Sequence, residues 1–554
     1  MTKEIIKVFK FLEKNHKLLL YKTILISFLS SIFQFISIFL IYPIIYLSLD
    51  SNVQISEIKK TNQFIDILNN FLNKLDLRII SIFLVTFLIF SLLSKLYFYI
   101  LNIKISGNAN LDLKMKNYKN YFEMDYLDEI KIVKSNLITH LNVRADKFKE
   151  FVQSTFNLLN NFFNFLFLTL LVLIVDTNII FVILTLTTIF IFFYNLLKKF
   201  NKSFYLKEYK IYKIFNEINI SFLFSKYEIL MNQLKNNMLI YFKANKEKEI
   251  KLEILKNSIN FSPRLIIEFF LYILIACYIY LNSNIIEQNI AQIGVLALAG
   301  LRIMPTCYSM YKEYINLRIL KNYFKDNLEI KKKAIKSNSN IKFKNLNIIK
   351  VDAKFSYDQK KYFKFNFLAK KNDKILLFGP SGSGKSTLIK IIAGIIKIEI
   401  PNIILVNNKN IHQNISQYWK NISYLAQDGL MMPGTLKENI TLKKKLNNDE
   451  EKRYKEIFYL VQLFKIKKDF RKFNNTFIDF DSKIISGGQK QRILIARALF
   501  KKADILLFDE SFNQLDRKSE IQIIENIKKK VKNKIIIISS HRPVKNFYTK
   551  KYKL

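Results

Sequence analysis

The chain has 554 residues, of which 50% are hydrophobic, and its formal net charge is +44. This length indicates more than one domain. A basic chain raises nucleic acid as a partner, but no compact basic or arginine–aromatic motif occurs, so we expect no nucleic-acid binding. The two cysteines, Cys277 and Cys307, lie in apolar segments and form neither a disulfide framework nor a metal-ligand spacing.

The first 320 residues contain six apolar segments that are long enough to cross a bilayer, for which about 20 residues are needed. The segments 23–49 and 177–197 carry no charged residue at all. The alternative is a soluble protein with buried helices, which uncharged runs of this length argue against. The predicted spans are about 23–49, 79–103, 151–175, 177–197, 265–286 and 288–315.

The connections between the spans predict their orientation. The segments 104–150 and 198–264 are long and rich in Lys, which places them in the cytoplasm. The first connection, 50–78, has balanced charge, as suits the outer side. We expect a cytoplasmic N-terminus without a cleavable signal, because a charged stretch precedes a first span that is too long for a signal core. The predicted location is the bacterial inner (cytoplasmic) membrane, with the segment after the spans in the cytoplasm.

A phosphate-binding loop follows the predicted membrane part. The run Gly379-Pro380-Ser381-Gly382-Ser383-Gly384-Lys385-Ser386 stands between an apolar strand-like run and a helical one. Its glycines let successive N–H groups and the helix N-terminus face the phosphates of a nucleotide. Lys385 would reach the phosphates, and the hydroxyl of Ser386 would bind Mg²⁺. The predicted nucleotide-binding residues here are Gly379, Ser381, Gly382, Ser383, Gly384, Lys385, Ser386 and Thr387.

Further motifs follow in a fixed order. Gln427 ends a probable strand and is able to coordinate Mg²⁺ or orient water. The run Ser486-Gly487-Gly488-Gln489 begins a helix and offers a second phosphate-facing N-terminus. An apolar strand then ends in two carboxylates: Asp509 suits Mg²⁺ ligation and Glu510 suits polarising the attacking water. After a further apolar run comes His541, which can contact a γ-phosphate.

This series resembles the nucleotide-binding domain of ABC transporters. The resemblance implies an α/β P-loop ATPase domain over residues 331–554, which binds ATP and Mg²⁺ and hydrolyses ATP. It implies that Glu510, His541 and Gln427 are catalytic, and that Ser386, Gln427 and Asp509 bind the metal. It also implies that Tyr357 stacks on adenine and that the signature residues Ser486, Gly487, Gly488 and Gln489 contact the nucleotide.

The sequence departs from the ABC pattern at three places. Ile485 replaces the leucine that opens the signature, and Asn513-Gln514-Leu515-Asp516 replaces the usual Ser-Ala-Leu-Asp of the D loop. The stretch 479–482 lacks the usual glutamate and glycine. None of these changes removes a catalytic group.

One such domain cannot complete its own site, because in this family the signature of one copy covers ATP held by another. With six spans in residues 1–330 and one ATPase domain, the resemblance implies a half-transporter of the exporter class. Its fold is then a helical membrane domain with long cytoplasmic extensions plus the ATPase domain. The implied partner is a second copy of the chain, although a heterodimer is not excluded. We expect short coupling helices near 125–130 and 225–230.

The last two spans resemble those of bacterial lipid-linked oligosaccharide flippases. The resemblance rests on Pro263-Arg264 followed by Glu268, and on the run 297–305. It implies an ATP-driven translocase that flips a polyprenyl-diphosphate-linked oligosaccharide across the cytoplasmic membrane. The membrane lipids and this lipid-linked glycan are then its expected partners. The alternative is an exporter of another cargo, such as a lipid A-like lipid, a peptide or a drug.

Two charged residues lie inside predicted spans, namely Lys95 and Arg302. An intramembrane charge is costly and by default faces a protein-lined cavity. Two copies of each would make a positive belt that suits a diphosphate, since Arg gives bidentate phosphate contacts. The structural alternative is that Lys95 reaches the inner headgroups and that Arg302 pairs internally.

Overall fold

The chain forms two compact units in the computed structural model. One comprises Met1–Phe122 and Ile132–Lys331, the other Glu123–Lys131 and Lys332–Leu554. We call them the N-terminal and the C-terminal unit and describe each by itself. The structure describes all residues except 1, 42, 45–76, 133–136, 138, 176–210, 212–213, 216–217, 219–229, 282–289, 326–342, 344, 359, 399–402, 428, 464–475, 479–484 and 541–546.

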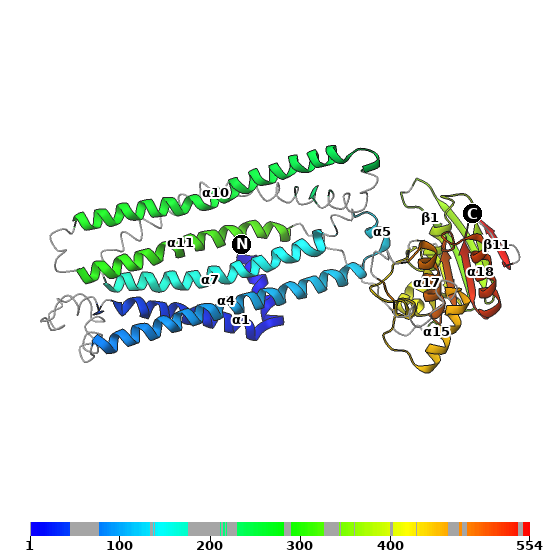
Figure 1. The fold of residues 1–554 in the computed structure, drawn as a ribbon, viewed down its shortest axis with the longest axis horizontal. Helices are drawn as coiled ribbons and strands as arrows, with labels where there is room; N and C mark the ends of the chain where they lie inside the picture. Colours follow the sequence, from blue (N-terminus) through cyan, green and yellow to red (C-terminus); the bar gives the residue numbers. More distant parts are fainter. Residues whose placement is uncertain are drawn as a thin grey trace. The chain divides into compact units, whose positions relative to one another are not determined.

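Long helices that run alongside one another build the N-terminal unit (Figure 1). The helix α4 has 46 residues, which corresponds to about 70 Å at 1.5 Å per residue. A bilayer's hydrocarbon core is only about 30 Å thick, so a helix of this length can cross it and continue well beyond. The long helices are α1 (Thr2–Phe39), α4 (Leu77–Phe122), α7 (Arg144–Val175), α10 (Lys235–Leu281) and α11 (Ile290–Lys325), with a π-helical turn, η2 (Thr139–Val143), before α7.

Three helices of the described residues are long and apolar enough to cross a membrane: Ile5–Phe39, Arg78–Phe122 and Leu141–Ile174. They contain residues 23–39 of the predicted span 23–49, the whole of the predicted span 79–103, and residues 151–174 of the predicted span 151–175. The described parts of the spans 265–286 and 288–315 are helical in α10 and α11. The predicted span 177–197 lies outside the described residues.

Amide side chains join three of these helices. Asn102 of α4 donates to Asn157 Oδ1 of α7 over 2.8 Å, and Asn157 Nδ2 donates to Glu313 Oε1 of α11 over 3.1 Å. Around them an apolar cluster takes residues from α1, α4, α7 and α11, among them Leu12 and Phe156. Hydrogen bonds between amide side chains are a recurrent way of joining helices where water is scarce. The four helices therefore share one core.

The C-terminal unit is built on a five-stranded parallel sheet with the strand order β11-β3-β10-β9-β6. Every residue of β9 and β10 is buried, as expected for parallel strands that are covered on both faces. The carboxyl ends of these strands meet at one edge, and the phosphate loop follows β3 there. The strands are β3 (Lys374–Phe378), β6 (Ile422–Leu425), β9 (Ile505–Asp509), β10 (Ile535–Ser539) and β11 (Lys550–Lys553).

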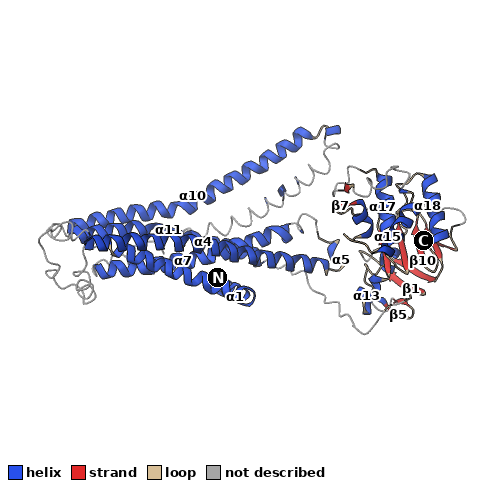
Figure 2. Cartoon of the chain, turned by 60° about the horizontal axis from the view of Figure 1, so that its bottom comes forward, coloured by secondary structure: helices blue, strands red, loops and turns tan. Residues whose placement is uncertain are grey.

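A second, antiparallel sheet and several helices complete this unit (Figure 2). The sheet has the order β2-β1-β4-β5, and β7 (Gly434–Thr435) pairs with β8 (Phe477–Ile478). The sheet consists of β1 (Ile348–Phe355), β2 (Phe363–Lys370), β4 (Ile403–Val406) and β5 (Lys409–Asn410). The helices are α5 (Tyr126–Glu129), α12 (Lys385–Ile392), η5 (Ile411–Gln413), α13 (Ile415–Lys420), α14 (Leu436–Thr441), α15 (Asn448–Leu460), α17 (Gly487–Phe500) and α18 (Arg517–Lys530).

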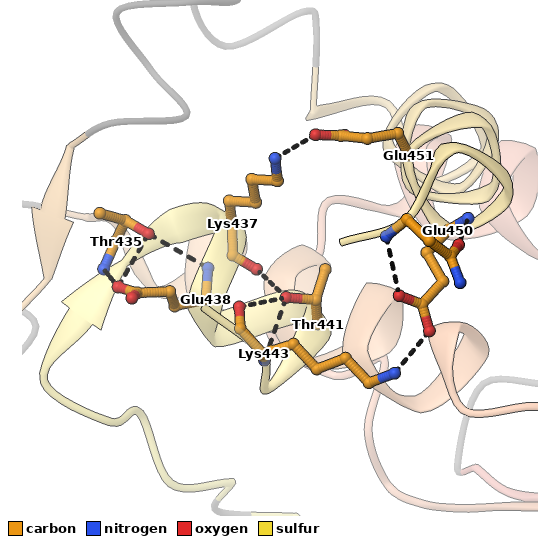
Figure 3. A network of polar contacts seen from close by, with 8 residues as sticks. Thr435, Lys437, Glu438, Thr441, Lys443, Glu450 and Glu451 are labelled. Atoms are coloured by element: carbon orange, nitrogen blue, oxygen red, sulfur yellow. Dashed lines mark hydrogen bonds and ion pairs between the residues drawn. The ribbon is translucent and has the colours of Figure 1, made fainter. Parts of the chain in front are cut away.

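Each of the helices α14 and α15 begins with its own capping box, and two ion pairs link the α14 segment to α15 (Figure 3). Thr435 and Glu438 cap α14, and Asn447 and Glu450 cap α15 by the same exchange of side-chain and backbone bonds. Lys437 of α14 pairs with Glu451 of α15, and Lys443 pairs with Glu450. Arg497 of α17 adds a bond to the Asn439 carbonyl of α14 over 2.6 Å. The segment that follows Gln427 is thereby held against the helix that carries the signature.

We expect Ile537→Ala to lower the stability of the C-terminal unit by about 2–5 kcal/mol, the usual cost of a large-to-small change in a core. Ile537 lies in the middle of β10 with 0% of its surface exposed. Thermal unfolding of the full chain in detergent measures the effect. Ile403→Ala is the matched control, since Ile403 is 44% exposed. Equal unfolding temperatures for the two variants would contradict this assignment of the core.

Candidate nucleotide site

The phosphate loop has the backbone that its glycines allow. Gly382 and Gly384 have φ angles of +76° and +101°, which side-chain-bearing residues seldom adopt. A Cβ on Gly384 would also lie 2.8 Å from Phe363 Cδ1. Lys385 Nζ donates to the carbonyls of Gly379 and Pro380, each over 2.9 Å, so its ammonium group lies over the loop. The loop therefore has the shape of a phosphate cradle.

One hydroxyl group of the loop is suited to a hydrogen bond with an anion. The hydroxyl oxygen of Ser383 is buried and has no hydrogen-bond partner among the described residues. A buried hydroxyl without a partner costs free energy, and a phosphate oxygen would supply the missing bond. The loop thus fits a nucleotide phosphate.

The predicted magnesium ligands Ser386 and Asp509 lie together. Ser386 Oγ donates to Asp509 Oδ1 over 2.9 Å, and Ser539 Oγ donates to the same oxygen over 2.9 Å. Burial raises the pKa of the Asp509 carboxyl above its usual range, although these two hydrogen bonds act in the opposite direction. A cation would favour the ionised form of this buried carboxyl, so the oxygen donors fit Mg²⁺.

The remaining predicted residues take three different positions. Gln427 is exposed and follows β6, the strand beside β9, so it lies at the same sheet edge as Asp509. Tyr357 packs edge-on against Phe355, with ring centroids 4.9 Å apart, and its hydroxyl lies 3.4 Å from Thr387 Oγ1 of α12. An aromatic ring beside the phosphate loop suits an adenine. His541 lies outside the described residues.

The signature lies at the start of α17 in the same unit and makes none of the described contacts with the phosphate loop. Ser486 caps α17: its Oγ accepts from Gln489 N over 3.3 Å, and Gln489 Oε1 accepts from Ser486 N over 3.0 Å. Ser486 and Gly487 are exposed. Among the described contacts, those of the signature reach Gln514 and Leu515 and none reaches the phosphate loop. The exposed start of α17 is therefore free to face a nucleotide held elsewhere.

The sequence reasoning missed two residues of this site. Ser539 donates to Asp509 Oδ1 and accepts from the backbone N–H of Glu510 over 2.9 Å. Asn513 Nδ2 donates to Glu510 Oε2 over 3.2 Å. A serine that ends an otherwise all-isoleucine strand was the available signal for Ser539. For Asn513 the signal was its departure from the ABC pattern.

Comparison with known proteins agrees with this geometry. Residues 362–513 match the ABC transporter family. A putative export ATP-binding/permease protein of Rickettsia bellii is 36% identical over 207 residues, which cover 36% of this chain and 34% of that protein. The multidrug resistance-like ATP-binding protein MdlA of Buchnera aphidicola is 32% identical over 315 residues, 54% of this chain and 53% of that protein. The lactococcin-A transport/processing ATP-binding protein LcnC of Lactococcus lactis is 32% identical over 201 residues, 36% of this chain and 27% of that protein.

Each of these alignments covers about half or less of the relative's own length, and the largest of the three covers 53% of the relative. A solved structure extends the likeness to the whole fold. A bacterial Atm1-family ABC exporter with ATP bound superposes with a TM-score of 0.75 over 95% of this chain and 91% of that chain, at 13% identity. The expected fold class is thus confirmed: the chain has the fold of that ABC exporter, and its C-terminal unit contains an ABC transporter domain, which implies binding of ATP with Mg²⁺.

Proposed function

We propose that the chain works as a homodimeric, ATP-driven exporter in the bacterial cytoplasmic membrane, with its ATPase unit in the cytoplasm. The observation that carries this proposal is that none of the described contacts joins the signature at Ser486 to the phosphate loop at Lys385 within one chain. A second copy would bring its signature over the nucleotide. A heterodimer with a related half-transporter would do the same.

ATP supplies the transferable phosphoryl group, and Mg²⁺ neutralises the charge that develops on it. In this chain Lys385 and the loop N–H groups would bind the phosphates, while Ser386 and Asp509 would hold the metal together with Gln427. Glu510 would polarise the attacking water, with His541 completing the polar surroundings. Signature residues from the second copy would exclude solvent.

A short helix, α5 (Tyr126–Glu129), lies between Asp125 and Ile130, at the first position where we expect a coupling helix. It belongs to the C-terminal unit, although its neighbours in sequence belong to the N-terminal one. Tyr126 and Leu127 pack against the buried core of the C-terminal unit. The second expected position, 225–230, lies outside the described residues except for Leu230.

A cation anchors α5. Lys390 Nζ donates to the Tyr126 hydroxyl over 2.8 Å and lies 4.9 Å from the centre of the Tyr126 ring. Burial alone would lower the pKa of Lys390, but the bond to Tyr126 contributes to holding that pKa above its usual range. Lys390 belongs to α12, the helix that begins at Lys385. This contact would carry movement of α5 to the nucleotide site.

The cargo proposal rests on Lys95 and Arg302. Lys95 lies in α4 and Arg302 lies in α11. Neither has an ion-pair partner among the described residues, so the internal pairing considered for Arg302 is not found there. Two cations without counter-ions favour an anionic cargo. This supports our finer proposal, the flipping of a polyprenyl-diphosphate-linked oligosaccharide.

An exporter of another cargo is the second candidate. The names of the relatives favour it, since one is described as multidrug resistance-like and another as a lactococcin transporter. A peptide, a drug or a lipid A-like lipid would then be moved by the same ATPase.

We expect Lys390→Met to lower ATP-driven transport about tenfold while basal ATP hydrolysis changes less than about twofold. The change removes a hydrogen bond to a charged group, worth about 1.5–3 kcal/mol, but leaves the phosphate loop intact. Tyr126→Phe keeps the ring and should cost less. Transport and ATPase rates in liposomes check this, with the exposed Lys518→Met as control. Unchanged transport by Lys390→Met would refute the coupling role.

We expect Arg302→Ala in liposomes to abolish ATP-dependent movement of a short polyprenyl-diphosphate oligosaccharide while ATP hydrolysis persists. Loss of a bidentate phosphate contact is the physical reason. The readout is loss of this lipid from the outer leaflet. Arg302→Lys should retain part of the movement because it keeps the charge.

Two control variants accompany the measurement on Arg302→Ala. Lys104→Ala removes an exposed cation from the same helix as Lys95, nine positions further on, and should transport normally. Glu510→Gln should stop both hydrolysis and transport. ATP-dependent movement of a peptide or drug without movement of the lipid would retain the exporter and discard the flippase.

A further inference from the structure

The D loop of this chain departs from the ABC pattern beside the proposed catalytic carboxylate. Asn513 stands where the pattern has serine, and its Nδ2 donates to Glu510 Oε2 over 3.2 Å. Its backbone N–H also bonds the Glu510 carbonyl over 3.3 Å. Asn513 is exposed, so burial in a core does not account for the position of its side chain. A polar contact with the carboxylate does.

The backbone at Glu510 is unusual as well. Its φ is +49°, in the left-handed region that residues with a side chain seldom adopt. The N–H of Glu510 donates to Ser539 Oγ over 2.9 Å, and this serine also bonds Asp509. Strained backbone persists only where its surroundings hold it, and such places cluster at functional sites. The direction in which the Glu510 side chain leaves the backbone is therefore set by β10.

The turn between Glu510 and Asn513 is anchored on two sides. Ser511 Oγ donates to the Leu425 carbonyl at the end of β6 over 3.0 Å, and Gln491 Nε2 of α17 donates to the Ser511 carbonyl. Ser511 is fully buried. Because the turn is fixed, the amide of Asn513 stays within reach of the carboxylate.

The next residue, Gln514, lies against the signature. A Cβ on Gly487 would be 3.4 Å from Gln514 Oε1, and one on Gly488 would be 3.5 Å from the Gln514 carbonyl oxygen. Adjacent residues thus touch the catalytic carboxylate and the signature of the same chain. A shift of the signature glycines would displace Gln514 and, with it, Asn513.

We propose that Asn513 is a positioning residue for ATP hydrolysis, whose side-chain amide, through its bond to Oε2, holds the Glu510 carboxylate in the orientation from which it polarises the attacking water. This inference rests on the role proposed above for Glu510. An ionised carboxylate is free to rotate unless a donor fixes it, and hydrogen bonds to charged groups are the stronger ones. Through Gln514, the orientation of Glu510 depends on the position of the signature, which would face the nucleotide of the second copy.

An isosteric series at position 513 of the full chain tests this. Asn513→Leu removes the donor and should lower kcat for ATP about tenfold or more, with KM within about twofold, because a bond to a charged group is lost. Asn513→Asp replaces the donor by a like charge and should lower kcat further. If the D loop needed only a side chain of this size, all three residues would give equal kcat, which would overturn the proposal.

A double-mutant cycle tests whether Glu510 is the group on which Asn513 acts. With Glu510→Gln as background, Asn513→Leu should change the single-turnover rate less than about twofold, because the carboxylate it positions is already gone. Additive losses would show that Asn513 acts on another group. If Glu510→Gln alone hydrolyses ATP at the wild-type rate, the proposed role of Glu510 fails, and with it the basis of this inference.

A nucleotide-free structure of Asn513→Leu in detergent adds a readout that does not depend on activity. We expect the Glu510 side chain to leave its place beside residue 513 while Ser539 keeps its bond to the Glu510 N–H. An unmoved Glu510 carboxylate would overturn the proposal. Asn448→Leu and Asn448→Asp are the matched controls for charge and size, since Asn448 is exposed in the first turn of α15. Both should hydrolyse ATP at the wild-type rate.

Discussion

The nucleotide site depends on the hydrogen bonds that the buried Asp509 carboxylate accepts. This carboxylate lies at the end of a fully buried strand and accepts from Ser386 of the phosphate-loop helix and from Ser539 of the neighbouring strand. Three segments that are far apart in the sequence thereby meet at one oxygen. Burial of this carboxyl is unfavourable for its ionised form unless donors or a cation are near. The site is therefore arranged around a buried carboxylate that two hydroxyl donors stabilise and that fits a metal, and Ser539 also holds the neighbouring backbone at Glu510.

The contact between Tyr126 and Lys390 fixes α5 within the C-terminal unit. The segment 123–131 follows α4 directly but belongs to the C-terminal unit. A short helix such as α5 has little stability of its own, so its position is set by packing on the core and by the bond from Lys390. Since Lys390 shares a helix with Lys385, the anchor of α5 and the phosphate cradle are parts of one rigid element.

Much of the site was predictable because its motifs are local. A phosphate loop requires certain residue types at fixed spacing between a strand and a helix, and the structure places Gly379–Ser386 in that setting, between β3 and α12. The apolar runs of Ile505–Phe508 and Ile535–Ile538 likewise predict buried parallel strands, because both faces of such strands are covered. In the helical part, five of the six predicted spans have described residues, and all of these except Leu40 are helical.

The sequence by itself determined that a helical part precedes an α/β part and that a phosphate loop stands between a strand and a helix, since each depends on spacing or on hydropathy within a short window. The exporter fold followed from the resemblance to ABC exporters, and the roles of Lys385, Ser386 and Asp509 as nucleotide and metal ligands stay predictions. Only the tertiary structure decided which distant groups meet. The bonds of Ser539 to Asp509, of Asn513 to Glu510 and of Lys390 to Tyr126 depend on strand order and on packing. No periodicity encodes these pairs, because a contact between remote residues is fixed by the whole core around them and not by their neighbours in sequence.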